Sequence, residues 1–246
     1  MTHDDEPVGR VLTRREILAL LGATGVLWLA RCSGPGSIAR PAGPAVTAGC
    51  VVRPEMTAGP YFVDGALERS DVRTDPATGE ARPGKPLDLE FRVSRIAAEG
   101  CVPLAGAVVD VWQCDALGIY SDVRDASSDT RGQKFLRGHQ VTDADGVARF
   151  TTIYPGWYQG RAVHVHFKIR AAPDAPSGFD FTSQLFFDDA LTDRVHAGDP
   201  YASHGRRRTT NAADSFFRQG GADLVLALEP AGEGYRGTFE VALEGV

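Results

Sequence analysis

The most informative stretch of the chain reads Arg161-Ala162-Val163-His164-Val165-His166-Phe167-Lys168-Ile169-Arg170. Its β-branched and aromatic residues predict a β-strand. Because a strand sends every second side chain to the same face, His164 and His166 point the same way, with Cα atoms ~6–7 Å apart. That spacing lets two imidazoles converge on one metal ion. The alternative is a pair of polar side chains on the wet face of an edge strand.

Strand-like patterns continue over most of the chain. A turn signal at Asp143-Ala144-Asp145-Gly146 predicts a hairpin turn. Short strands separated by turn signals indicate an antiparallel sandwich or barrel. We therefore expect an all-β fold, an antiparallel β-sandwich with long loops and little helix. The expected strands are residues 86–96, 107–112, 139–142, 147–154, 162–170, 181–187, 223–228 and 237–243, and the expected helix is 189–197.

The N-terminus carries an export pattern. Arg14 and Arg15 precede an apolar run, residues 17–30, that has no charge. Such a run is shorter than the ~20 residues of a membrane span, and a twin arginine before it is typical of an export signal. The alternative is a short buried helix.

From this pattern we expect a twin-arginine signal over residues 1–33, a flexible Gly/Pro/Ala tether over 34–49 and one domain over 50–246. The protein would be extracellular or in the cell envelope, with no integral membrane span in the mature chain. Lipidation of Cys32 is not favoured, because Arg31 stands where a lipoprotein signal needs a small residue.

Charge and cysteine content restrict the partners and the compartment. The formal net charge of −6 argues against nucleic acid or an anionic membrane as a partner. In an oxidising compartment, the three cysteines after the signal predict one disulfide and one free thiol. Cys50 and Cys101 lie beside expected loops, whereas Cys114 ends an apolar strand. This favours a Cys50–Cys101 disulfide, although the other pairings stay open.

Two tyrosines change how the histidine pair is interpreted. Tyr120 lies where an expected strand runs into a loop, and Tyr158 lies in a turn a few residues before the histidine strand. Two phenolates with two imidazoles suit ferric iron, which deprotonates tyrosine readily, whereas zinc sites draw on Cys, His and carboxylate. One alternative is that both tyrosines are ordinary half-buried residues. Another is a copper or zinc oxidase that uses both histidines and one tyrosine.

Several motifs occur in order between about Cys50 and Asn211. They are Gly59-Pro60-Tyr61-Phe62, Pro103-Leu104-Ala105-Gly106-Ala107, Asp110-Val111-Trp112-Gln113, Gly118-Ile119-Tyr120, Gly138-His139-Gln140-Val141-Thr142-Asp143, Phe150-Thr151-Thr152-Ile153-Tyr154-Pro155-Gly156-Trp157-Tyr158 and Arg161-Ala162-Val163-His164-Val165-His166-Phe167. Together they resemble the intradiol ring-cleavage dioxygenases, in particular the β-type chain of protocatechuate 3,4-dioxygenase and its exported, single-chain relatives.

The resemblance implies an oxidoreductase of aromatic-compound catabolism with one non-haem Fe(III) per chain. Tyr120, Tyr158, His164 and His166 would be the metal ligands. The enzyme would cleave the ring of a catechol-type aromatic between its two hydroxyls with O2, giving a muconate-type diacid.

The resemblance also assigns roles around the metal. The tyrosinate at Tyr158 would leave the metal and take up a catechol proton, and Arg161 would stabilise negative charge that develops on the substrate. Gln184 and Tyr61 would line the substrate pocket, with Gln184 also on the oxygen side. Trp157 would either cover the iron or serve packing alone.

Two departures from the family pattern leave questions open. The chain lacks the N-terminal helical dimerisation region of catechol 1,2-dioxygenases, and it has no second sandwich to replace the α-type partner of protocatechuate dioxygenase. The identity of the catechol and the oligomeric state therefore stay open, a homo-oligomer included. The competing function is an exported β-sandwich binding module with a vestigial or differently metallated site.

Overall fold

The structure, a computed structural model, describes residues 49–65, 67–125, 128–175 and 177–246. The predicted export signal (1–33) and all of the predicted tether except residue 49 lie outside the described residues. No helix in these ranges is long and apolar enough to cross a bilayer.

The first of two sheets is built around β1. Its strands are β1 (Pro86–Ala97), β2 (Gly100–Pro103), β5 (Val147–Ile153), β8 (Glu229–Ala231) and β9 (Gly234–Leu243). β2 and β5 pair with different parts of β1 in antiparallel fashion, and β8 pairs with β9 in the same way. The β1–β9 pairing is parallel, from Leu87 opposite Tyr235 to Arg95 opposite Leu243. This one parallel ladder departs from the expected antiparallel pattern, because β9 returns from the far end of the chain.

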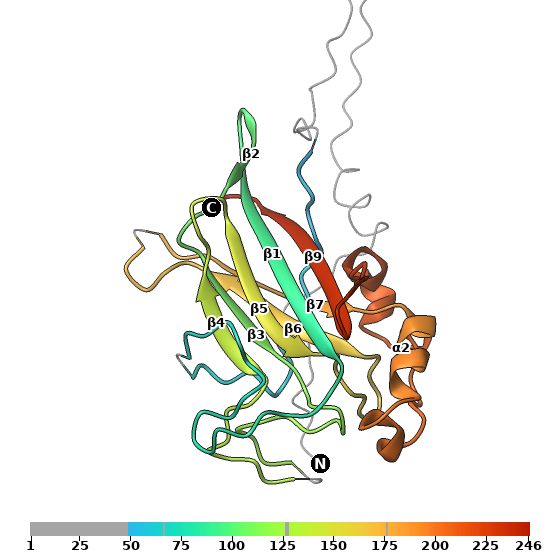
Figure 1. Cartoon of the computed structure of the whole chain (residues 1–246). Coiled ribbons are helices and arrows are strands. Elements are labelled where there is room, and N and C mark those ends of the chain that lie inside the picture. Colours follow the sequence, from blue (N-terminus) through green and yellow to red (C-terminus); the bar gives the residue numbers. More distant parts are fainter. Residues whose placement is uncertain (1–48, 66, 126–127, 176) are drawn as a thin grey trace, which may run out of the picture. The chain divides into compact units, whose positions relative to one another are not determined.

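The second sheet carries the histidine strand and is antiparallel throughout. Its order is β4 (Arg137–Val141), β3 (Val108–Trp112), β6 (His164–Arg170) and β7 (Asp180–Phe186). Figure 1 shows the two sheets as layers, with the helical segments beside them. These segments are α2 (Asp189–His196) and the 3-10 turns η1 (Tyr201–His204), η2 (Asn211–Ala213), η3 (Phe217–Gln219) and η4 (Gly221–Leu224). The all-β sandwich predicted from the sequence is confirmed.

Phenylalanines from both sheets interlock in the core. Phe91 and Phe239 come from the first sheet and Phe167 from the second, and the Phe167 ring centroid lies 5.2 Å from that of Phe91 and 5.4 Å from that of Phe239. Burying such a ring contributes roughly 2–3 kcal/mol. Since Phe167 alternates with His166 along β6, a ring that enters the core forces the neighbouring imidazole onto the opposite face.

The strand expected at residues 223–228 is wrong. The chain there forms η4 and then contacts β7 through one bridge, between Val225 and Phe186. Leu224 and Leu226 are both buried, so their alternating apolar pattern reflects packing against the core and not a place in a ladder. β2 was not expected at all, since its four residues carry too short a pattern.

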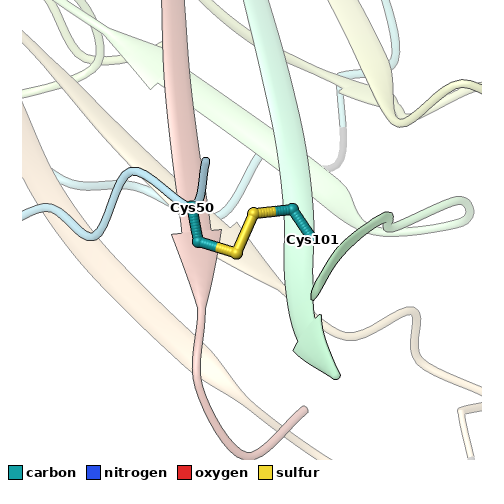
Figure 2. The surroundings of a disulfide bond; sticks show 2 residues. All are labelled: Cys50 and Cys101. Atoms are coloured by element: carbon teal, nitrogen blue, oxygen red, sulfur yellow. A yellow bond between two sulfur atoms is a disulfide. The ribbon is translucent and has the colours of Figure 1, made fainter. Parts of the chain in front are cut away.

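A disulfide ties the N-terminal segment to the sandwich. Cys50 is joined to Cys101 in β2, with Cα atoms 5.4 Å apart (Figure 2), and Cys114 is free and buried. Beyond the disulfide, Val51 accepts a hydrogen bond from Ala242 in β9, and Met56 donates one to Thr182 in β7. The segment therefore runs from one sheet to the other.

Removing this disulfide should destabilise the domain without changing its fold. The cross-link joins residues 51 apart in sequence. We expect the Cys50→Ser/Cys101→Ser double variant to lose about 2–4 kcal/mol of unfolding free energy, because the unfolded chain regains the entropy of an open loop. Urea denaturation measures the loss. Reducing the wild-type protein should reproduce it and leave the variant unchanged, whereas a loss below ~1 kcal/mol would contradict the prediction.

Candidate functional site

The histidine pair lies on an interior strand. β6 is flanked by β3 and β7, and His164 and His166 are 2% and 1% exposed, which excludes the wet edge-strand alternative. The His166 ring is stacked on Trp112 of β3, with ring centroids 4.9 Å apart and planes 5° from parallel. The Nε2 atoms of the two histidines are 3.0 Å apart. Strand register and ring stacking thus aim both nitrogens at one point.

Both imidazoles are held in the neutral form. Burial, assisted by the positive charge of Arg161, lowers the pKa of His164 to about 3, and burial also lowers the pKa of His166 well below its usual range. The Nδ1 of His164 lies 2.7 Å from the Ala162 carbonyl oxygen. Since a carbonyl only accepts, Nδ1 carries the proton and donates it, which leaves a lone pair on Nε2. A neutral imidazole with a free Nε2 lone pair can bind a metal ion.

The two tyrosines reach the same point from two loops. The Tyr158 hydroxyl lies 3.2 Å from His164 Nε2, and the rings of Tyr120 and Tyr158 meet edge to face, with centroids 5.6 Å apart. The Tyr120 hydroxyl is buried and has no partner with hydrogen-bond geometry, although Tyr158 is close enough to influence its pKa. Burial is the main cause that raises the pKa of both phenols. An unpartnered buried hydroxyl is costly and calls for a ligand.

Close backbone contact keeps the two tyrosine loops together. The Gly156 N–H donates to the Asp115 carbonyl, and the Asp115 carboxylate accepts from the backbone of Leu117 and Ile119, just before Tyr120. A Cβ on Gly156 would lie 2.4 Å from the Asp115 oxygen, and one on Gly118 would lie 2.3 Å from the Trp157 oxygen. Only glycine fits at either position. The loops therefore place Tyr120 and Tyr158 as one unit.

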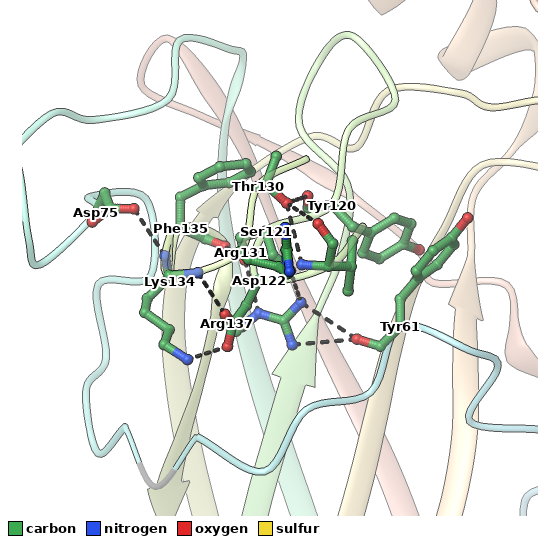
Figure 3. A network of polar contacts seen from close by, with 12 residues as sticks. Tyr61, Asp75, Tyr120, Ser121, Asp122, Thr130, Arg131, Lys134, Phe135 and Arg137 are labelled. Carbon is green, nitrogen blue, oxygen red and sulfur yellow. Dashed lines mark hydrogen bonds and ion pairs between the residues drawn. The ribbon is translucent and has the colours of Figure 1, made fainter. Parts of the chain in front are cut away.

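Tyr61 and a buried arginine hold Tyr120 in place. The ring of Tyr61 is stacked on Tyr120 with centroids 4.4 Å apart, and its carbonyl accepts two hydrogen bonds of 3.3 Å from Arg137. Arg137 also binds the side chain and carbonyl of Ser121, next to Tyr120 (Figure 3). Burial lowers the pKa of Arg137 to about 10, against the opposing charges of Asp122 and Tyr120, so the guanidinium stays charged at neutral pH.

Arg161 is held by two buried partners. Its Nε donates to Asp214 at 3.0 Å, and a second nitrogen donates to the side-chain oxygen of Gln184. The Gln184 amide in turn donates to the Thr57 carbonyl at 3.0 Å. Gln184 stands opposite His166 in the β6–β7 ladder. The predicted site residues Arg161 and Gln184 are therefore in contact with each other and next to the histidines.

The sequence patterns did not identify Asp214 as a site residue. It is fully buried and also accepts hydrogen bonds from the backbone of Ala162, Phe216 and Phe217. Burial alone would raise its pKa, but the Ala162 N–H and the charge of Arg161 outweigh burial and lower it. Asp214 follows Arg161 by 53 residues, in an irregular segment without any periodic pattern. No local signal in the sequence marks it.

A cavity of about 710 Å³ opens beside the tyrosines. Its walls are formed by Tyr61, Leu117, Gly118, Ile119, Asp125, Trp157, Tyr158, Gln159, His204 and Arg208. Tyr158 lines the cavity, whereas Tyr120 lies beneath Tyr61. The two phenols thus differ in access: Tyr158 faces the cavity, and Tyr120 is covered by Tyr61.

The donor set fits a Lewis-acidic metal ion. No group of three or more His, Cys, Asp or Glu residues that could hold a metal occurs in the described ranges, so a site here must include the tyrosines. Two neutral imidazoles and two phenols converge, and a buried phenol gives up its proton only to a strong positive charge. The unpartnered Tyr120 hydroxyl fits this requirement. The set therefore suits a trivalent ion better than zinc.

Comparison with known proteins agrees with this picture. A protein-family model described as dioxygenase matches residues 57–216. The chain is 32% identical to chlorocatechol 1,2-dioxygenase of Pseudomonas putida over 149 residues, covering 53% of this chain and 52% of that protein. It is 31% identical to the protocatechuate 3,4-dioxygenase beta chain of Burkholderia cepacia over 156 residues, covering 58% and 65%. The chain thus spans between half and two thirds of these curated relatives.

A solved structure matches over a larger share. The intradiol ring-cleavage dioxygenase from Tetranychus urticae is 29% identical, with a TM-score of 0.67, covering 79% of this chain and 95% of that one. The similarity therefore extends over nearly the whole of that chain.

Replacing the buried carboxylate of Asp214 should destabilise the site. We expect Asp214→Asn to cost about 2–4 kcal/mol of unfolding free energy at neutral pH, because Arg161 loses its buried counter-charge. The folded-state pKa of Asp214 is lowered. Its contribution is therefore present above the ordinary aspartate pKa and is lost as the pH falls through the folded-state value.

Urea titrations from neutral to acidic pH measure this effect, and the difference between wild type and variant should shrink in acid. The control is Asp180→Asn, which removes an exposed partner of Lys168 and should cost less than ~1 kcal/mol. Equal losses in the two variants, or a difference that grows in acid, would contradict the prediction.

Proposed function

Since the chain belongs to the intradiol ring-cleavage dioxygenases, we propose that it binds one non-haem Fe(III) and cleaves a catechol-type aromatic between its two hydroxyls. Both atoms of O2 enter the product, a muconate-type diacid, so the reaction needs no external reductant. The observation that carries the proposal is the convergence of Tyr158 and His166 on the Nε2 of His164, beside the unpartnered hydroxyl of Tyr120.

Tyr120, Tyr158, His164 and His166 would hold the iron. When bound, ferric iron supplies a Lewis acid that lowers the pKa of phenols and of catechol hydroxyls and links the aromatic ring electronically to O2. The protein's part is to keep both imidazoles neutral, which burial achieves.

Tyr158 is the residue suited to take up a substrate proton. It lies on the cavity wall and is half-buried, whereas Tyr120 is 2% exposed beneath Tyr61. A catechol entering from the cavity meets the Tyr158 oxygen first. As a phenolate, that oxygen accepts a proton from a catechol hydroxyl and becomes a neutral phenol. Tyr120 stays in place, because the ring of Tyr61 covers it.

Arg161 supplies a fixed positive charge beside the histidines. Its side chain is 12% exposed, and Asp214 and Gln184 hold it on two sides. A charge that is already positioned in a water-poor site stabilises negative charge developing on the substrate without reorganisation. The role of Asp214 and Gln184 is then to orient the guanidinium.

An exported binding module with a vestigial or differently metallated site is the competing function. It predicts a colourless protein that lacks iron even after growth with ample iron. Metal content therefore distinguishes the two functions before any assay of turnover.

Changing Tyr158 should alter both colour and turnover. We expect the purified protein to contain about one iron per chain, to show a visible tyrosinate-to-iron absorption band and to consume O2 with catechol. Tyr158→Phe should shift the band and lower kcat by at least about 100-fold, since a proton acceptor in the reaction is lost. Spectroscopy, oxygen uptake and product identification measure these changes.

The matched control is Tyr235→Phe, which changes a half-buried tyrosine in β9 beside Tyr154 and should leave the band and kcat unchanged. Extradiol products would contradict the reaction class. An unaltered spectrum and rate in Tyr158→Phe would contradict the role of that residue.

We also propose that residues 1–33 direct export by the twin-arginine route, so that the domain acts outside the cytoplasm. The disulfide between Cys50 and Cys101 supports this, because such bonds persist mainly in oxidising compartments. A route that carries folded proteins suits a domain that must acquire a metal before it crosses.

Conservative changes in the arginine pair test the route. We expect Arg14→Lys/Arg15→Lys to keep the protein inside the cell, because the signal is read through the two arginines. Cell fractionation and immunoblotting measure the distribution. Arg10→Lys, a change outside the pair, should leave export intact, and export of the double variant at the wild-type level would refute the proposed route.

A further inference from the structure

The cavity beside Tyr158 is far larger than a catechol ring. Its volume of about 710 Å³ lies within the range of sites that hold whole drug-sized ligands. Leu117, Ile119 and Trp157 give it apolar walls beyond the tyrosines. The space therefore accommodates a ring that carries a substituent. The residues that line the cavity determine which kind of substituent binds best.

The wall of this cavity carries one acidic and one basic side chain, Asp125 and Arg208. Asp125 is engaged, since its carboxylate accepts hydrogen bonds from the Ser128 backbone at 2.9 Å and from the Tyr61 hydroxyl at 3.4 Å. Arg208 is exposed and lines the same cavity, and within the described part of the chain it forms no hydrogen bond or ion pair. One wall thus offers a cation without a counter-ion.

The neighbours of Arg208 have different roles. Arg207 binds Asp189 and Asp193, and its side chain is only 6% exposed. Arg206 lines a separate cavity with Asp193 and His196. Of the three consecutive arginines, Arg208 alone lines the cavity next to Tyr158.

Trp157 fixes the arginine loop against the tyrosine loop. Its indole N–H donates to the Gly205 carbonyl at 3.1 Å, and His204 Nε2 donates to the Trp157 carbonyl at the same distance. The rings of Trp157 and His204 also pack together, with centroids 4.4 Å apart. These contacts lie three and four residues before Arg208 and one before Tyr158. The cation therefore has a defined place relative to the site.

We propose that Arg208 binds an anionic substituent of the substrate, so that this chain prefers catechols that bear a carboxylate. The inference rests on the proposed function and deepens it. A guanidinium pairs with a carboxylate in a fixed two-pronged geometry, while the apolar walls pack against the ring or a short side chain. Asp125 repels a carboxylate turned towards Tyr61, which leaves one favourable orientation.

Acid and ester pairs test the proposal. The substrates are dihydrocaffeate with its methyl ester, protocatechuate with its methyl ester, and catechol. We expect a kcat/KM about five- to tenfold higher for the acid than for the ester of the better pair, the range for a partly exposed charge-assisted hydrogen bond. The pair with the larger ratio shows whether the carboxylate sits on the ring or on a side chain. In dihydrocaffeate the methylenes insulate the catechol hydroxyls from the ester, so that pair reports binding alone.

The variants are Arg208→Gln, Arg208→Lys and the matched control Arg206→Gln. Arg208→Gln should bring the acid-to-ester ratio to about one, Arg208→Lys should keep part of it, and Arg206→Gln should keep all of it. Higher salt should lower the wild-type ratio. A wild-type ratio of about one, or the same ratio in wild type and Arg208→Gln, overturns the proposal. Equal losses in Arg206→Gln and Arg208→Gln would also overturn it, because they indicate a diffuse field and no specific contact.

Failure of the proposed function gives a different result. If no catechol is turned over, the ratio of the Kd values of dihydrocaffeate and its ester, measured by quenching of tryptophan fluorescence, tests Arg208 by itself. A tighter Kd for the acid that disappears in Arg208→Gln supports the subsite even then, and equal Kd values refute it.

Discussion

Two imidazoles and two phenols are buried around one point, and the neighbouring strands, loops and charged side chains hold them there. Burial keeps His164 and His166 neutral and raises the pKa of Tyr120 and Tyr158. Buried polar atoms that face one another in a water-poor site cost free energy unless a common partner binds them. A single strongly Lewis-acidic cation does so, which is why the proposed iron and the observed packing belong to the same argument.

The sandwich holds these donors with two different degrees of rigidity. The histidines belong to β6, inside a four-stranded sheet, and Phe167 between the sheets prevents that strand from shifting by one residue. The tyrosines come from loops, which are held by glycine-sized contacts and by Asp115. Tyr158 faces the cavity and Tyr120 lies under Tyr61. This difference matches a site in which one phenol changes partners during the reaction and the other stays.

Two positively charged side chains, Arg161 and Arg137, lie beside the candidate metal ligands on separate segments of the chain. Arg161 is neutralised by Asp214, and Arg137 lies behind Tyr120 bound to backbone and hydroxyl oxygens. Arg161 precedes β6, and Arg137 begins β4 opposite Trp112. Arg208 adds a third positive charge on the wall of the cavity. The proposed substrate, a catechol with a carboxylate, follows from two cations in two places: Arg161 lies beside the histidines, and Arg208 lines the cavity.

The strand predicted at 162–170, the common face of His164 and His166 and the choice of Tyr120 and Tyr158 as candidate ligands all came from the sequence, because alternation and ordered motifs are local properties of a chain. The fold was needed to show that β9 joins β1 in parallel, that Asp214 binds Arg161 and that Arg208 lines the cavity. These contacts link irregular or distant segments, where no period relates one residue to the next. The same limit explains the wrong strand at 223–228: buried leucines alternate there, but alternation reports which side chains are buried and not what the backbone pairs with.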